Sequence, residues 1–95
     1  MAKYRKKPVV IDAIQWTGND ADILVFLAVL EAPMDTVRIL PAAAAGLAGE
    51  GECLMIKGCD GMLTAPLGHW LIRGIKGEFY CCSPDVFALS YDRVD

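Results

Sequence analysis

The sequence predicts an α+β domain with one antiparallel sheet of five or six strands, one helix packed on it, and a short helical turn near the C-terminus. Short runs of β-branched and aromatic residues recur along the chain, and glycine or proline separates them. One longer segment, about 20–31, has apolar side chains at helical spacing. The 95 residues fit a single domain, since typical domains have ~100–150 residues.

The first strand is expected at 9–16, after a basic arm over 1–7. Its two alternating sets of side chains are both largely apolar, which indicates a central strand covered on both sides. Asp12 is the exception. It could accept hydrogen bonds from a turn or an arginine, or it could be a buried carboxylate in a pocket.

The helix at about 20–31 has a suitable N-cap in Asn19, and acidic residues follow it where the helix dipole favours them. Val25 and Val29 lie off the core-facing stripe and are also apolar. A helix that is apolar on two sides is either deeply buried or lies at a subunit contact, and in so short a chain we favour the contact. The core-facing stripe consists of Ile23, Phe26, Leu27 and Leu30.

Three more strands are expected in the middle of the chain, at 36–40, 52–57 and 62–65. The segment 42–51 lies between the first two of these strands and is rich in alanine and glycine. It could form a short helix or a mobile loop.

Residues 68–82 predict a β-hairpin, the strongest local signal in the chain. Gly74 and Gly77 bound a four-residue turn, which places Arg73 opposite Glu78. Because side chains alternate between the faces of a strand, this register divides the hairpin into an apolar and a mixed face. The apolar, core-facing set is Trp70, Ile72, Phe79 and Cys81. The mixed set is His69, Leu71, Arg73, Glu78, Tyr80 and Cys82.

The mixed face has two interpretations. It could be a solvated surface on which Arg73 and Glu78 form an exposed ion pair worth roughly 0.2–1 kcal/mol. It could instead be a ligand platform, with Tyr80 as a stacking surface and with Arg73 and Lys76 as anion-binding groups.

After the hairpin, Ser83 and Pro84 suit the N-cap and the first position of one helical turn. A last short strand is then expected at 88–92.

The composition favours a chain with a substantial core and with apolar surface beyond it. Apolar residues make up 55% of the chain and charged residues 22%. Such an excess in a small chain typically covers a subunit interface, so we expect a homo-oligomer, a dimer or larger. The net charge of −3 argues against sequence-specific nucleic-acid binding, for which a basic domain is typical.

We expect a cytoplasmic protein without membrane attachment. The longest apolar run is far shorter than the roughly 20 residues of a membrane-spanning helix. The basic N-terminal arm lacks the apolar stretch of a signal peptide. The four cysteines are therefore expected to be free thiols.

Several segments resemble small tailed-bacteriophage proteins that carry a Pro-Gly-Asp-Tyr-Gly type domain. These segments are residues 4–18, residues 68–80, the run 84–87 and Tyr91. The family pattern has an acid before its aromatic residue, whereas this chain has His69 there and Leu67 after Pro66. The resemblance implies a phage gene expressed in the cytoplasm of a bacterial host, and it implies no activity.

Catalysis is not expected. The one histidine, His69, lies opposite Cys82 in the predicted register, but no orienting group or oxyanion site accompanies the pair. Cys53, Cys59, His69 and Cys82 could supply zinc ligands, but they lack the spacing typical of zinc sites. We therefore predict no enzyme, no catalytic residue, no metal site and no cofactor.

The main functional hypothesis is a module that sequesters a small anionic ligand, such as a cyclic-nucleotide or ADP-ribose-type immune signal of the host. Basic side chains would hold the anion, aromatic rings would stack on the ligand, and glycines would allow close approach. The pocket would lie where the arm of one subunit meets the hairpin of another. The candidate ligand-binding residues are Arg5, Lys7, Asp12, Trp16, His69, Arg73, Lys76, Glu78 and Tyr80.

The alternative hypothesis is a protein–protein module, an accessory or assembly factor. It would bind a host or virion protein through the apolar helix face or through an open sheet edge.

Overall fold

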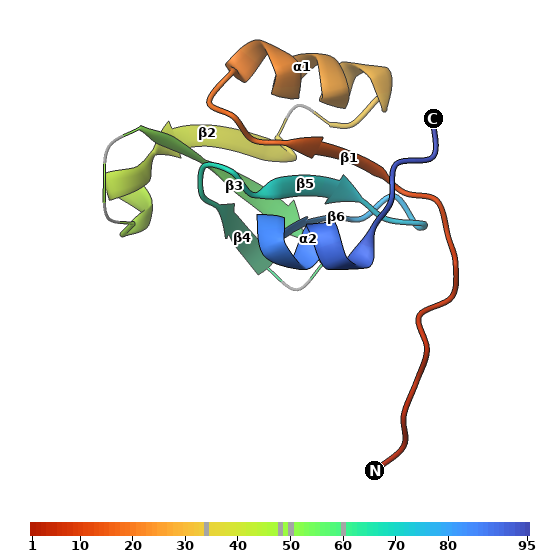
Figure 1. Ribbon diagram of the computed structural model, residues 1–95. Helices are drawn as coiled ribbons and strands as arrows, with labels where there is room; N and C mark the ends of the chain where they lie inside the picture. Colours follow the sequence, from red (N-terminus) through yellow and green to blue (C-terminus); the bar gives the residue numbers. More distant parts are fainter. Residues whose placement is uncertain (34, 48, 50, 60) are drawn as a thin grey trace.

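The computed structural model describes residues 1–33, 35–47, 49, 51–59 and 61–95. Over these residues the chain is α+β, as predicted, with antiparallel strands and two α-helices (Figure 1). The elements are β1 (Asp12–Gln15), α1 (Asp20–Val29), β2 (Val37–Pro41), the 3₁₀ helix η1 (Ala42–Ala45), β3 (Glu52–Gly58), β4 (Gly61–Ala65), β5 (Trp70–Arg73), β6 (Phe79–Cys82) and α2 (Pro84–Ser90).

The strands form two three-stranded sheets rather than the single sheet that was predicted. One sheet has the order β1-β5-β6 and the other the order β2-β3-β4. The chain changes sheet between β4 and β5, where Pro66 has no N–H for a ladder and Gly68 has a positive φ of 91°. Strand β5 then pairs with β1 and β6, while β6 only packs near β3 and β4.

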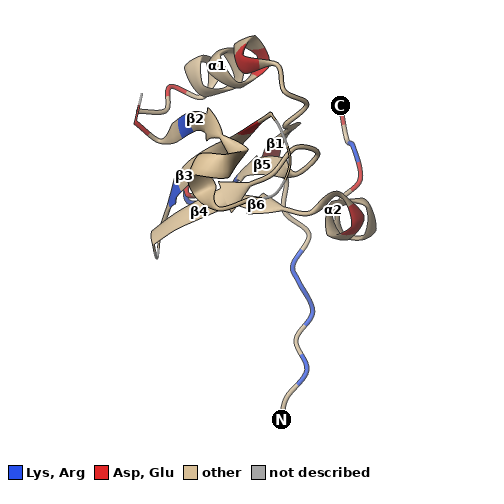
Figure 2. Ribbon diagram, turned by 90° about the vertical axis from the view of Figure 1, so that its left-hand side faces the viewer, with Lys and Arg blue, Asp and Glu red and all other residues tan. Residues whose placement is uncertain are grey.

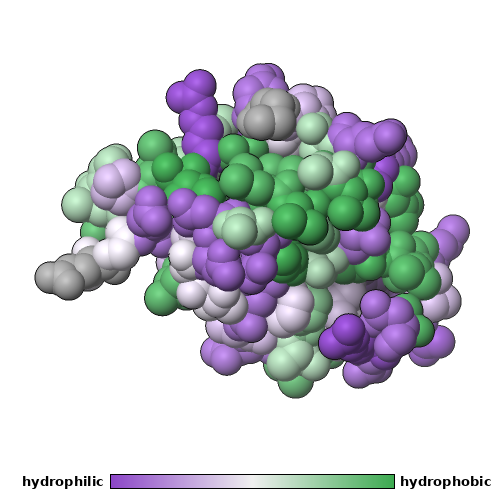
Figure 3. Space-filling view, turned by 90° about the horizontal axis from the view of Figure 1, so that it is seen from above, coloured by the Kyte–Doolittle hydropathy of each residue, from purple (hydrophilic) through white to green (hydrophobic). Residues whose placement is uncertain are grey.

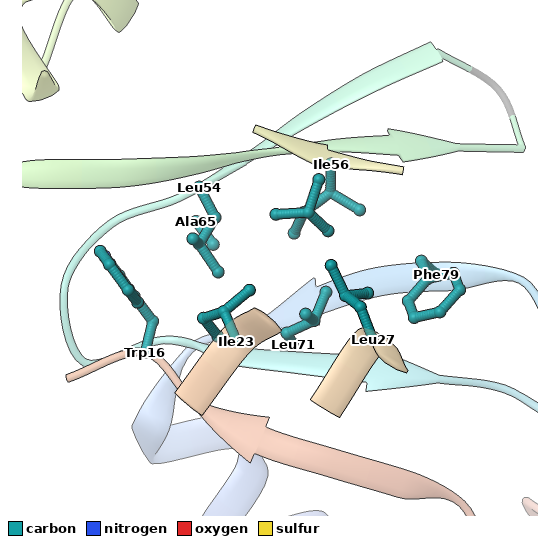
Figure 4. Packing of buried hydrophobic residues seen from close by; sticks show 9 residues of the cluster. Trp16, Ile23, Leu27, Leu54, Ile56, Ala65, Leu71 and Phe79 are labelled. Carbon is teal, nitrogen blue, oxygen red and sulfur yellow. The ribbon is translucent and has the colours of Figure 1, made fainter. Parts of the chain in front are cut away.

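The core lies between the two sheets. Leu54 and Ile56 of β3 point toward Leu71 of β5, and α1 adds Ile23 and Leu27 from the side (Figure 4). Of these five side chains, all except Leu27 are 0–1% exposed, and Leu27 is 7% exposed. The hydrophobic contact between β-branched and leucine side chains therefore holds together sheets that share no ladder.

Trp16, directly after β1, joins the two sheets. Its side chain is fully buried, and its indole N–H donates to the carbonyl oxygen of Glu52 at 3.0 Å. Its backbone N–H donates to the carbonyl of His69 at 2.8 Å, which extends the pairing of β1 with β5. A buried indole needs such a partner, because an unpaired N–H in a core is costly.

The prediction that the first strand is central is wrong. β1 lies at the edge of its sheet and pairs only with β5, and residues 1–10 are exposed and outside regular structure. The apolar side chains of Val9 and Val10 caused the error, because they precede the strand and do not enter the core.

The two helix predictions differ in outcome. The predicted cap of α1 is confirmed, since the side chain of Asn19 accepts a hydrogen bond from the N–H of Ala21 at 3.0 Å. At the C-terminus the helix has seven residues, begins at Pro84 and continues to Ser90. The strand predicted at 88–92 is therefore wrong. None of the described helices is both apolar enough and long enough to cross a membrane.

The segment 42–51, left open as a short helix or a loop, begins with η1. Gly46 ends this turn with a left-handed φ of 76°, and its N–H bonds back to the carbonyl oxygens of Ala42 and Ala43. Ala48 and Glu50 of this segment lie outside the described residues.

Replacing Leu71 with alanine should lower the free energy of unfolding by about 2–5 kcal/mol, since it leaves a cavity between the sheets. Urea unfolding followed by circular dichroism measures this loss. The matched control is Ile75→Ala, at an exposed turn position, which should change stability by less than about 0.5 kcal/mol. Equal losses in the two variants would contradict the placement of the core.

Candidate functional site

The hairpin pairs in a different register from the predicted one. Arg73 pairs with Phe79, and Trp70 pairs with Cys82, so the loop comprises the five residues 74–78. The N–H of Gly74 donates to the carbonyl of Glu78 at 2.8 Å, and Gly77 closes a tighter turn with a positive φ of 79°. The predicted register is wrong by one residue because the loop has one more residue than the glycines suggested.

This register divides the predicted ligand platform. Leu71 and Phe79 are buried toward the core, whereas Trp70 lies on the other face and stacks on Phe87 of α2, with ring centroids 3.9 Å apart. Trp70 and Phe79 thus lie on opposite faces of the sheet, contrary to prediction. Arg73 pairs with Phe79, and Tyr80 is the next residue along β6, so the two proposed ligand-binding groups also point to opposite faces.

The charged residues of the predicted site also do not converge. Nη1 of Arg73 lies 3.9 Å from Oδ2 of Asp12. Asp12 therefore has an arginine partner, which was one of the two predicted alternatives for this carboxylate. Asp12 is exposed and is not a buried pocket acid. Glu78 does not pair with Arg73 across the hairpin, because its carboxylate accepts the N–H of Lys76 at 3.1 Å and lies against Gly74.

The remaining predicted residues lie apart from one another. Arg5 and Lys7 are in the exposed N-terminal segment, and Lys76 is exposed at the hairpin turn. Trp16 is fully buried, so no ligand can stack on it.

His69 is half-buried, and Cys82 pairs with Trp70 rather than with this histidine. The four cysteines are free thiols, as predicted. Among the described residues, no three histidine, cysteine, aspartate or glutamate side chains group together at metal-binding distance.

Tyr91 and Lys6 form a contact that the sequence did not reveal. Nζ of Lys6 donates to the hydroxyl of Tyr91 at 2.6 Å and lies 4.3 Å from the ring centroid. The hydroxyl oxygens of Tyr91 and Tyr80 are 3.3 Å apart. Phe87 and Tyr91 are four residues apart, the spacing of neighbours on one helix face. This spacing could have predicted a longer helix here in place of the strand.

The contact gives the two tyrosines different acidities. The hydrogen bond from Lys6 stabilises the phenolate of Tyr91 and lowers its pKa. Burial, and then the hydrogen bond with Tyr91, raise the pKa of Tyr80. Tyr91 is therefore the one of the pair that ionises first.

Beside β1 lies a groove of about 650 Å³. Its first wall is the N-terminal segment 9–15, and its second is the C-terminal segment 91–95, which passes the start of β1 in Figure 1. Phe26 of α1, Trp70 and Phe87 complete the lining. Its charged side chains are Asp12, Asp92, Arg93 and Asp95.

The groove does not suit an anion, because three carboxylates accompany one guanidinium group and Arg93 is already bonded to Asp95 at 2.8 Å. A smaller hollow of about 290 Å³ lies between the end of β3, the start of β4 and the start of β6, and Glu78 is the charged residue among the described residues that line it. Neither hollow, as far as the described residues line it, has the cluster of basic groups that an anionic ligand needs.

Comparisons with protein-family models, with curated proteins and with solved structures find no match to this chain.

Replacing Lys6 with glutamine should raise the pKa of Tyr91 toward the ordinary value of 10.0, because the ammonium group that stabilises the phenolate is lost. An alkaline titration followed by tyrosinate absorbance measures the change, and Tyr91→Phe identifies the tyrosine. Lys3→Gln, elsewhere in the exposed segment, is the matched control. An unchanged titration in Lys6→Gln would show that this contact does not form in solution.

Proposed function

We propose that this chain is a non-catalytic accessory module that binds another protein through the outer face of α1. The observation that carries the proposal is that α1 is apolar on both sides. Ile23 and Leu27 enter the core, while Leu24, Val25 and Val29 are 55%, 62% and 75% exposed. Figure 3, which looks down on the molecule from the side of α1, shows hydrophobic side chains gathered across this face.

The charges on α1 indicate the kind of partner. Asp20 and Asp22 lie in the first turn, and no basic residue lies in the last turn. Figure 2 shows acidic and no basic residues along the helix. A helix that is apolar with acidic residues at its margin fits an apolar groove bordered by lysine or arginine, the common helix-in-groove arrangement. Burial of the exposed side chains would supply the affinity, and the acidic margin would favour a basic partner.

Sequestration of a cyclic-nucleotide or ADP-ribose-type ligand is less well supported. It depended on Arg73 and Tyr80 sharing a face, and the observed register separates them. Trp16, one of the rings suggested for stacking, is fully buried. Protein binding requires none of these groups.

The resemblance to tailed-phage proteins completes the proposal. It suggests that the partner is a host or virion protein and that binding takes place in the cytoplasm of an infected bacterium.

The double variant Val25→Glu/Val29→Glu should lose at least tenfold in affinity for the partner, because it places two charges in the centre of the contact. Tagged protein, used to capture partners from a bacterial lysate, identifies the partner by mass spectrometry. Titration of the purified partner then gives the affinity.

Leu89→Glu is the matched control, since Leu89 is an exposed apolar side chain on α2. It should bind as the unmodified protein does, and circular dichroism should show that all variants are folded. Equal capture by both variants would refute α1 as the contact. A nucleotide that stays bound through gel filtration, with no captured protein, would favour the sequestration hypothesis.

A further inference from the structure

Strand β1 has one edge without a strand partner. Because Trp16 donates its N–H to His69, the alternation of an antiparallel ladder directs the backbone of Ile14 and Asp12 toward β5 and that of Ala13 and Gln15 away from it. In the described part of the chain, no backbone hydrogen bond outside the regular elements involves Ala13 or Gln15. Their N–H and C=O groups therefore border the groove, where they can pair with an added strand.

The charges that line the groove beside this edge favour an extended segment with basic side chains. Asp92 and Asp95 lie on the wall opposite β1, and Asp12 lies on the β1 side. Arg93 and Asp95 pair with each other, so the lining keeps an excess of carboxylates over guanidinium groups. An incoming strand with basic side chains would therefore be attracted, and its apolar side chains could contact Phe26 and Val94.

The chain itself has a segment of this description. Residues 1–10 are exposed, the first of them extend away from the body, and Figure 2 marks basic residues along the N-terminal trace. The segment contains four basic residues, Lys3, Arg5, Lys6 and Lys7. Tyr4 lies among them, and Pro8, Val9 and Val10 follow. A proline is tolerated in a strand that lies at a sheet edge.

The arm cannot fill the groove of its own chain. It is continuous with β1, and Lys6 is held by Tyr91, which lines the groove. Residues 1–5 therefore leave the body at the rim of the groove and extend outward (Figure 1). They can reach such a groove only on another molecule.

We propose that two copies of this chain exchange their N-terminal arms. Each arm adds as an edge strand to β1 of the other copy, and Lys3 and Arg5 lie beside Asp92 and Asp95. The exchange extends each β1-β5-β6 sheet by one strand, and it satisfies the backbone groups of Ala13 and Gln15. It goes beyond the proposed function, since it uses the groove and not the outer face of α1.

Two charge-reversal variants test the exchange, Lys3→Glu/Arg5→Glu in the arm and Asp92→Lys/Asp95→Lys in the groove. Light scattering coupled to gel filtration at low salt should give a dimer mass for the unmodified chain. Each variant alone should give a monomer mass, because arm and groove then carry like charges. An equimolar mixture of the two variants should recover the dimer, since every arm again faces a groove of opposite charge. Salt should weaken both dimers.

A monomeric unmodified chain, a variant that stays dimeric, or a mixture that stays monomeric would each overturn the exchange. Val25→Glu/Val29→Glu separates this proposal from the α1 contact. If arms are exchanged, it stays dimeric. If it becomes monomeric while both charge variants stay dimeric, the dimer contact is α1 and the exchange is refuted.

Discussion

The pairing register of β5 with β6 is the constraint on which most of this structure depends. With five residues in the loop, Leu71 and Phe79 turn toward the core, and Trp70 turns toward α2. A shift by one residue would exchange these faces, because strand side chains alternate strictly. The stacking of Trp70 on Phe87 then gives α2 a place to pack, and α2 in turn brings Tyr91 beside Tyr80 and Lys6. The C-terminal segment, and with it one wall of the groove, follows from the hairpin.

The second determinant is the division of the strands into two sheets. Each sheet buries one face against the other, and Trp16 adds a hydrogen bond between them. Because β1 is an edge strand of its sheet, its outer edge is available to a further strand. Several aromatic rings pack against other parts of the molecule: Trp16 in the core, Trp70 against Phe87 of α2, and Tyr91 beneath Lys6. The exposed surfaces include the apolar outer face of α1 and the unpaired edge of β1.

These two surfaces differ in physical character. The outer face of α1 offers apolar area with acidic margins, so binding there would depend mainly on burial, and salt would weaken only the contribution of the margins. The edge of β1 offers backbone hydrogen bonds in an acidic groove, so binding there would weaken as salt rises. The two surfaces lie on different elements, and one copy could use both at once. A dimer made through arms would then present two α1 faces, which increases the effective affinity for a partner with repeated sites.

Features that depend on neighbours in the sequence could be predicted from the sequence alone. They include the fold class, the N-cap at Asn19, the approximate positions of six strands, and the apolar outer face of α1. The hairpin was located, but its register was not, because glycine positions do not fix the number of loop residues. Long-range packing decided the change of sheet near Pro66 and the edge position of β1, whereas the continuation of α2 through Ser90 had a local signal in the spacing of Phe87 and Tyr91. Strand order and sheet membership depend on which apolar faces meet across the core, and that information is distributed over residues far apart in the chain. The predicted mixed face of the hairpin does not form for this reason, since it needed a side-chain orientation that only the tertiary structure sets.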